Sequence, residues 1–174
     1  MKQRILIELD KQGAEWVVVA YLSGDARMIE VIESGKKSHL VTGCLLTGAS
    51  EAVVLKEKNL GQMLTDPVQL EDIRRLNIPD IYKCHFLPRS MSVYQLGKKS
   101  NHALNYIIGP NQLAETMETD STETKKIIYN YTQLVYPNIP IWWESIKTQL
   151  KRDRTLATCF GDKRRFMDEW GQEL

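Results

Sequence analysis

The feature that most restricts the fold is a series of apolar segments that each end at a glycine. Three such segments follow one another near the start of the chain: 14–22 before Gly24, 26–33 before Gly35, and 39–46 before Gly48. Glycine is the residue that best tolerates the left-handed conformation in which many helices end. Asp25 and Ser38 precede the second and third segments, and both residue types cap helix N-termini well. The pattern predicts three consecutive α-helices.

The rest of the chain adds further helices and little strand. An apolar run at 5–9 predicts a short, largely buried strand that ends at Asp10. Beyond it, proline-broken and amphipathic segments alternate. Helical patterns cover 68–76, 97–108, 111–118, 123–136 and 141–150, of which 123–136 is the longest. A hairpin with a glycine turn covers 155–167. The expected class is α+β, predominantly α-helical, with a small β-hairpin near the C-terminus.

Size, charge and cysteine content narrow the classes of function. The 174 residues are 43% hydrophobic and 26% charged, which fits one folded domain. The formal net charge is only +1, so contact with nucleic acid requires a local basic patch. Three widely spaced cysteines favour a reducing compartment over a disulfide framework. Because no apolar stretch suits a signal peptide or a membrane span, we expect a cytoplasmic protein without a membrane partner.

A strand end and one helix face carry the first candidate chemistry. A carboxylate such as Asp10 at the end of a buried strand can hold a divalent cation, although it can equally cap a helix or a turn. Lys98, His102 and Tyr106 recur at every fourth position and therefore share one face of a helix. Two basic groups beside an aromatic ring suit a triphosphate with its base or sugar, and a solvated basic face with one packed tyrosine is the alternative.

Residues 147–165 form a second candidate region, in which the charge is strongly positive. Two aspartates stand there against seven basic residues, a local net charge of +5. The seven are Lys147, Lys151, Arg152, Arg154, Lys163, Arg164 and Arg165. A basic helix end that continues into a basic hairpin suits the phosphate backbone of DNA, although such charges also occur as solvated surface.

Two longer motifs stand at 10–25 and 97–106. The first is Asp-Lys-Gln-Gly-Ala-Glu followed by an apolar helix and Leu-Ser-Gly-Asp, and the second is Gly-Lys-Lys-Ser-Asn-His-Ala-Leu-Asn-Tyr. In this order they resemble motif A and a phage-like motif B of family A DNA polymerases, the group of bacterial DNA polymerase I and many phage replicative enzymes. Similarity continues at His39, at Tyr136-Pro137 and in the basic hairpin, so the resemblance covers nearly the whole chain.

The resemblance implies a division of the chain and a metal site. Residues 1–25 would be a palm fragment with the motif A strand, and 26–174 a fingers subdomain that contains the motif B helix at 97–109 and the basic hairpin at 155–167. Asp10 would be catalytic and, with the backbone carbonyl of Lys11, would bind Mg²⁺.

The same resemblance assigns the substrate contacts. Glu15 would pack beneath the sugar of an incoming dNTP and exclude a 2′-hydroxyl, with Tyr106 as the opposite wall. Lys98 and His102 would contact the triphosphate, and the seven basic residues of 147–165 would contact the DNA primer–template. The implied activity is that of a DNA-directed DNA polymerase in a bacterial or phage-infected cell.

Several departures from the family pattern change this expectation. His102 stands where the bacterial enzymes have Lys, and Pro110 where they have Tyr. The sequence has no His-Asp-Glu motif C and no thumb, whereas the two-metal mechanism needs more than one carboxylate. We therefore expect a fragment or split subunit that is inactive alone and needs a second polypeptide with motif C and the thumb, or a homo-oligomer. A non-catalytic DNA- or nucleotide-binding module and an unrelated helical domain are the alternatives.

Overall fold

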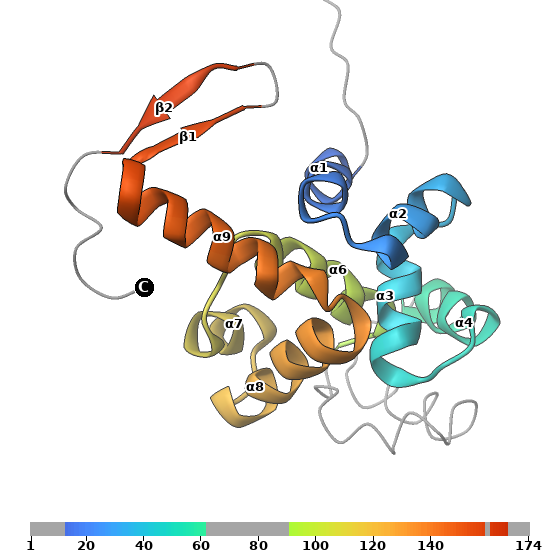
Figure 1. The fold of residues 1–174 in the computed structure, drawn as a ribbon. Coiled ribbons are helices and arrows are strands. Elements are labelled where there is room, and N and C mark those ends of the chain that lie inside the picture. Colours follow the sequence, from blue (N-terminus) through green and yellow to red (C-terminus); the bar gives the residue numbers. More distant parts are fainter. Residues whose placement is uncertain (1–12, 62–90, 159–160, 167–174) are drawn as a thin grey trace, which may run out of the picture.

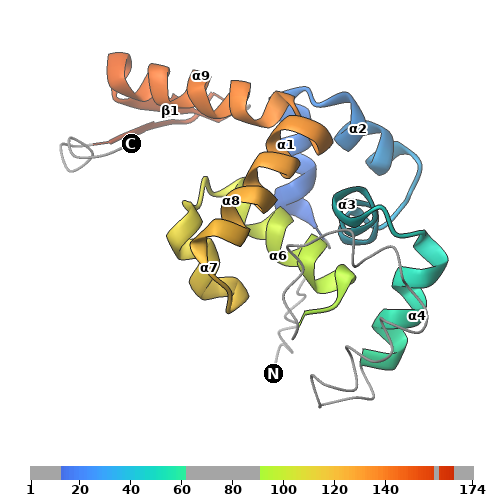
Figure 2. The same cartoon turned by 90° about the horizontal axis from the view of Figure 1, so that it is seen from below.

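The computed structural model describes residues 13–61, 91–158 and 161–166. Helices dominate them, with one two-stranded antiparallel sheet, which confirms the predominantly helical α+β class. The elements are α1 (Ala14–Ser23), α2 (Ala26–Glu33), α3 (Ser38–Thr47), α4 (Glu51–Gly61), α6 (Val93–Asn105), α7 (Pro110–Met117), α8 (Ser121–Tyr129), the π-helix η2 (Asn130–Val135), α9 (Asn138–Asp153), β1 (Thr155–Ala157) and β2 (Lys163–Arg165). In Figure 1, α9 runs from the helical body to the hairpin, and Figure 2 shows that the hairpin lies at one end of the molecule.

The helix boundaries near the start of the chain follow the predicted signals. Helix α2 has the predicted bounds, and Asp25 Oδ1 accepts hydrogen bonds from the backbone N–H groups of Arg27 (3.2 Å) and Met28 (3.1 Å). Gly24 and Gly48 follow α1 and α3 with φ angles of 62° and 76°, which glycine adopts without steric cost. The structure thus confirms the three consecutive helices that the sequence predicts before residue 50.

Helix α6 differs from the predicted motif B helix at 97–109. It begins four residues earlier, because Ser92 Oγ accepts a hydrogen bond from a backbone N–H of the first turn and caps the helix. It ends at Asn105, and Ile107 has a φ of 58°, which takes the chain out of the helix before 109. Tyr106 is therefore the C-cap of α6 rather than an interior residue.

The predicted long helix at 123–136 divides into α8 and η2. In η2 the turn widens, and the N–H of Tyr136 donates to the carbonyl oxygen of Tyr131, five residues back, at 2.8 Å. Both tyrosine side chains are fully buried as a result. Helix α9, with 16 residues, exceeds α8 in length, contrary to the sequence prediction.

The C-terminal hairpin is present but shorter than the predicted 155–167. Its strands pair antiparallel with Thr155 opposite Arg165 and Ala157 opposite Lys163. Gly161 has a φ of 89° in the turn, as a glycine turn requires. Residues 159–160 and 167 of the predicted hairpin lie outside the described residues.

The core forms where α6 crosses α3. A Cβ on Gly97 would lie 2.1 Å from the carbonyl oxygen of His39 and 2.7 Å from the backbone nitrogen of Gly43, so the two helix backbones are in direct contact. On either side of this crossing, Leu96 and Leu104 of α6 are fully buried. Glycine at position 97 therefore determines how closely these helices pack.

A second set of contacts fixes the start of α9. Asp25 Oδ2 accepts a hydrogen bond from the backbone N–H of Asn138 (3.2 Å), and Asn138 Nδ2 donates to the carbonyl oxygen of Gly24 (3.0 Å). Arg27 Nη1 donates to the last two carbonyl oxygens of η2, those of Leu134 and Val135. The α1–α2 turn and the η2–α9 turn are thus held together by polar contacts.

Among the described helices, none is by itself both long and apolar enough to cross a membrane; α3 and α4 meet that test only jointly, as a pair bent by 112°.

We expect Gly97→Ala to lower the free energy of unfolding by roughly 2–4 kcal/mol, because the new methyl group would overlap backbone atoms of α3. Chemical denaturation measures the change. Gly109→Ala is the matched control, since Gly109 has an ordinary φ of −72° and nothing within 4 Å of the added Cβ. Equal losses in the two variants would contradict the close α3–α6 contact.

Candidate functional site

Three of the predicted site residues form one exposed cluster, although Glu15 lies about 90 residues from the other two in the sequence. The Tyr106 hydroxyl donates a hydrogen bond to Glu15 Oε1, and His102 Nδ1 lies 3.4 Å from Glu15 Oε2. The rings of His102 and Tyr106 meet edge to face with centroids 5.4 Å apart. We call these residues the Glu15–His102–Tyr106 cluster. More than half of the Glu15 and His102 side chains is exposed, so the cluster is open to a ligand.

The positions of these side chains follow from two helices. Glu15 lies in the first turn of α1, where the next residue, Trp16, is buried and packs against the ring of Tyr136. Trp16 therefore fixes α1 on the core and leaves Glu15 on its outer side. His102 occupies the last turn of α6 and Tyr106 its C-cap, one turn apart on the same face.

The electrostatic environment of the cluster combines one carboxylate with several basic groups. Hydrogen bonding to Glu15 raises the pKa of Tyr106, so its hydroxyl stays protonated as a donor. Lys98 is exposed one turn before His102 on α6. The half-buried His39 of α3 contacts Asn101 of α6, and its pKa is lowered first by burial and then by the charges of Lys98 and His102. Lys98, His102 and His39 thus provide a basic surface beside Glu15.

Behind this surface lies a buried polar network. Asn101 Oδ1 accepts hydrogen bonds from Thr42 Oγ1 (2.9 Å) and Tyr131 Oη (3.2 Å), and Asn101 Nδ2 lies 3.2 Å from His39 Nδ1. Thr42 also contacts Tyr136 Oη at 2.7 Å. Thr42, Asn101, Tyr131 and Tyr136 are all buried. His39 is half-buried. The network connects the core to the edge of the candidate site.

The predicted metal ligands are not among these residues. Asp10 and Lys11 lie outside the described residues. Within 13–61, 91–158 and 161–166, no group of three or more His, Cys, Asp or Glu side chains is arranged to hold a metal ion.

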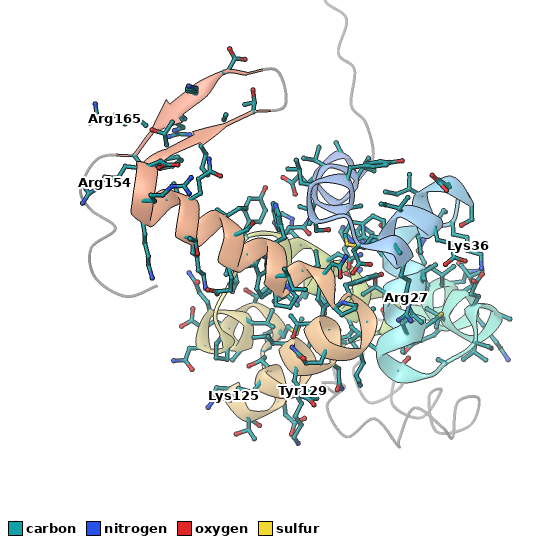
Figure 3. The ribbon with its side chains drawn as sticks, viewed as in Figure 1. Arg27, Lys36, Lys125, Tyr129, Arg154 and Arg165 are labelled. Carbon is teal, nitrogen blue, oxygen red and sulfur yellow. The ribbon has the colours of Figure 1, made fainter. Side chains whose placement is uncertain are left out.

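The basic residues of 147–165, which we call the basic arm, lie on α9 and the hairpin. Figure 3 shows Arg154 and Arg165 together at the base of the hairpin. Lys163, Arg164 and Arg165 are all exposed along β2. The arm therefore presents a run of cations on a narrow element that stands away from the helical body (Figure 1).

Lys147 and Arg152, two of the predicted DNA contacts, form ion pairs with neighbouring carboxylates on α9. Lys147 Nζ lies 3.0 Å from Glu144 Oε1, and only 21% of its side chain is exposed. Arg152 makes two hydrogen bonds to Asp153, which raise the pKa of the guanidinium and lower that of the carboxyl. Lys147 and Arg152 are thus weaker candidates for phosphate contacts than the β2 residues.

The outer face of α1 is apolar and open. Val18, Tyr21 and Leu22 are 54%, 56% and 55% exposed, respectively. Val18 and Leu22 follow Glu15 at helical spacing, so the apolar stripe starts beside the cluster.

His39 and Asn101 are site residues that the sequence interpretation did not assign. His39 lies 62 residues from Asn101, and their contact depends on the α3–α6 crossing. The available sequence signal was position alone: Asn101 directly precedes His102, and His39 begins a predicted helix.

Comparison with known proteins adds no family: the sequence matches no protein-family model and no curated protein.

The lowered pKa of His39 predicts a loss of stability in acid. Because the folded state resists protonation of His39, the unfolded chain takes up more protons as the pH falls below about 6.5, the ordinary pKa of histidine, and the free energy of unfolding decreases. We expect the wild type to lose more stability between pH 7.5 and 5.5 than His39→Gln, whose amide does not titrate. Chemical denaturation at both pH values measures this, and an equal loss in the two proteins would contradict it.

Proposed function

We propose that this chain forms the fingers and part of the palm of a template-directed DNA polymerase. The supporting observation is the Glu15–His102–Tyr106 cluster, in which two distant motifs meet at one exposed surface. A dNTP is the proposed ligand of this surface, and the DNA primer–template that of the basic arm. The cytoplasm of a bacterial or phage-infected cell is the proposed location.

Each residue of the cluster has a chemical role in this proposal. Lys98 supplies an ammonium donor and His102 an imidazole donor for the triphosphate, whose negative charge strengthens such hydrogen bonds. The Tyr106 ring, 57% exposed for the whole residue, offers an apolar wall to the sugar. Glu15, held by Tyr106, occupies the space beneath the sugar and would exclude a 2′-hydroxyl.

Catalysis in this proposal needs groups from a second chain. Mg²⁺ would be held by Asp10 and the Lys11 carbonyl and would supply charge stabilisation for phosphoryl transfer. A complete two-metal site requires a further carboxylate. A second polypeptide with motif C and the thumb is the proposed source, with a homo-oligomer as the alternative. The exposed stripe of Val18, Tyr21 and Leu22 on α1 supports a partner, because apolar side chains gathered on one helix face favour burial.

A non-catalytic DNA- or nucleotide-binding module is the second candidate function. The exposed cations of β2 support it equally well, because phosphate contacts need no catalytic carboxylate. Primer extension with the motif C polypeptide present distinguishes the two, since only a polymerase subunit gives a longer primer.

We expect Lys98→Ala and His102→Ala each to weaken dNTP binding by about tenfold, because each removes a charge-assisted contact to phosphate. Isothermal titration with a dNTP in buffer containing Mg²⁺ measures the affinity. Lys125→Ala is the control, since Lys125 is an exposed lysine on α8 (Figure 3), a helix that contributes no residue to the cluster. A similar loss in Lys125→Ala, or no dNTP binding by the wild type, would contradict the proposed site.

DNA binding is expected to depend strongly on salt through β2. Removing Arg164 and Arg165 by double alanine substitution should reduce the slope of log affinity against log salt by roughly 2, because each phosphate contact releases about one counterion. Fluorescence anisotropy with a labelled primer–template between low and moderate salt gives the slope. The double variant Lys125→Ala/Lys126→Ala removes the same charge from α8 and should leave the slope unchanged; an equal reduction there would exclude a specific role for the arm.

A further inference from the structure

Helix α6 ends in a left-handed turn whose central residue is an isoleucine. The N–H of Ile107 donates to the carbonyl oxygen of Leu104 (3.4 Å), and the N–H of Ile108 donates to that of Ala103 (3.3 Å). These two hydrogen bonds define the Schellman motif, in which the first residue beyond the helix end takes the left-handed conformation. Ile107, with a φ of 58°, is that residue.

An isoleucine is unfavourable at this position. Glycine is the common residue there because it has no Cβ, whereas a β-branched side chain is crowded in the left-handed region. In the same chain, α1 and α3 end at the left-handed residues Gly24 and Gly48. Gly109 stands only two residues after Ile107, yet its φ is an ordinary −72°. The surrounding structure therefore imposes the backbone conformation of position 107.

Apolar packing holds the turn in this conformation. Ile107 and Ile108 are both half-buried and pack against the main apolar cluster of the core, which contains Leu104 and Leu113. Burial of apolar surface can offset an unfavourable dihedral angle. Residues that are held in sparsely populated backbone regions in this way occur preferentially at functional sites.

The turn also sets the direction of the Tyr106 side chain. Tyr106 has a φ of −102° and a ψ of 12°, in the bridge region between helical and extended backbone. From this position its hydroxyl donates to Glu15 Oε1 on α1. If residue 107 were helical, α6 would continue and Tyr106 would take helical dihedral angles, which would turn its Cα–Cβ bond relative to α1. The contact between Tyr106 and Glu15 therefore depends on the conformation of Ile107.

We propose that Ile107 is a positioning residue, whose left-handed backbone ends α6 directly after Tyr106 and holds the Tyr106 hydroxyl on Glu15. The consequence for a ligand rests on the proposed function, in which Glu15 excludes a 2′-hydroxyl beneath the sugar of a dNTP. Ile107 then affects the choice between deoxyribose and ribose without contacting the nucleotide. The backbone of Ile107 and the contact between Tyr106 and Glu15 do not depend on that function.

Glycine and alanine substitutions at two adjacent positions test the backbone conformation. Ile107→Gly and Ile107→Ala both remove the apolar side chain, but only glycine takes the left-handed region without steric cost. We therefore expect a higher midpoint of chemical denaturation for Ile107→Gly than for Ile107→Ala. Ile108 is the matched control, because it is also half-buried and lies outside the left-handed region, so alanine should be favoured there. An equal or higher midpoint for Ile107→Ala, or glycine favoured at both positions, would overturn the inference.

Carbon-13 NMR of labelled tyrosine tests the positioning role in the full chain. The chain has seven tyrosines, and comparison with Tyr106→Phe assigns the Cζ signal of Tyr106. Glu15→Gln should shift this signal in the wild type, because the acceptor of the hydroxyl changes from a carboxylate to an amide. We expect the same shift in the Ile107→Gly background and only a small fraction of it in the Ile107→Ala background. Equal shifts in the two backgrounds, or none in the wild type, would overturn the positioning role.

Nucleotide titration tests the consequence for the sugar. Isothermal titration with dATP and with ATP, in buffer containing Mg²⁺, gives the ratio of the two affinities. We expect this preference for dATP to fall several-fold in Ile107→Ala and to persist in Ile107→Gly. Equal binding of both nucleotides by the wild type, or an unchanged ratio in Ile107→Ala, would overturn the effect on sugar selection. If the wild type binds neither nucleotide, the proposed function fails, and the Tyr106 signal decides the positioning role independently.

Discussion

At the crossing of α3 and α6 the two helix backbones touch, since a side chain on Gly97 would meet the carbonyl oxygen of His39. This approach has chemical consequences along both helices. On one side it brings Thr42 within hydrogen-bond distance of Asn101, and at the edge of the core it places His39 Nδ1 3.2 Å from Asn101 Nδ2. A wider crossing would separate these partners, because each contact spans only the distance between adjacent helices. The basic surface and the buried network therefore both depend on glycine at position 97, whose lack of a side chain lets α3 and α6 touch.

A single buried carboxylate connects this core to the basic arm. The N-termini of α2 and α9 both direct backbone N–H groups at Asp25, which is 2% exposed. Helix N-termini carry partial positive charge, so one aspartate satisfies two helix ends at once. Since α1 leads into the α1–α2 turn and α9 starts at the η2–α9 turn, the contact between the two turns relates the position of Glu15 to the direction in which the arm leaves the body. Asn138 and Arg27 reinforce it from the two sides.

Local signals predicted the helices well because their ends depend on nearby residues. Asp25 caps α2 and Gly24 and Gly48 follow helices as expected, and each effect involves only adjacent backbone. The errors arose where tertiary packing decides: the wide turn at η2 buries Tyr131 and Tyr136 together, and Ile107 ends α6 early. The helix-face pattern identified His102 and Tyr106 as neighbours. It could not place His39 beside Asn101, because contacts between distant segments follow from the fold and not from periodicity.

The candidate site is rigid behind and open in front. At its rear, Thr42, Asn101, Tyr131 and Tyr136 are buried and hydrogen-bonded to one another, whereas the side chains of Glu15 and His102 at its front are more than half exposed. Exposed ion pairs contribute little stability, so a ligand can exchange with the contacts of Glu15 at small cost. The buried network, in contrast, keeps its geometry because any misplaced donor would remain unpaired. The net charge of the chain is only +1, so binding of an anion depends on the positions of individual basic groups. On this surface the packing of α3 against α6 in the core determines those positions.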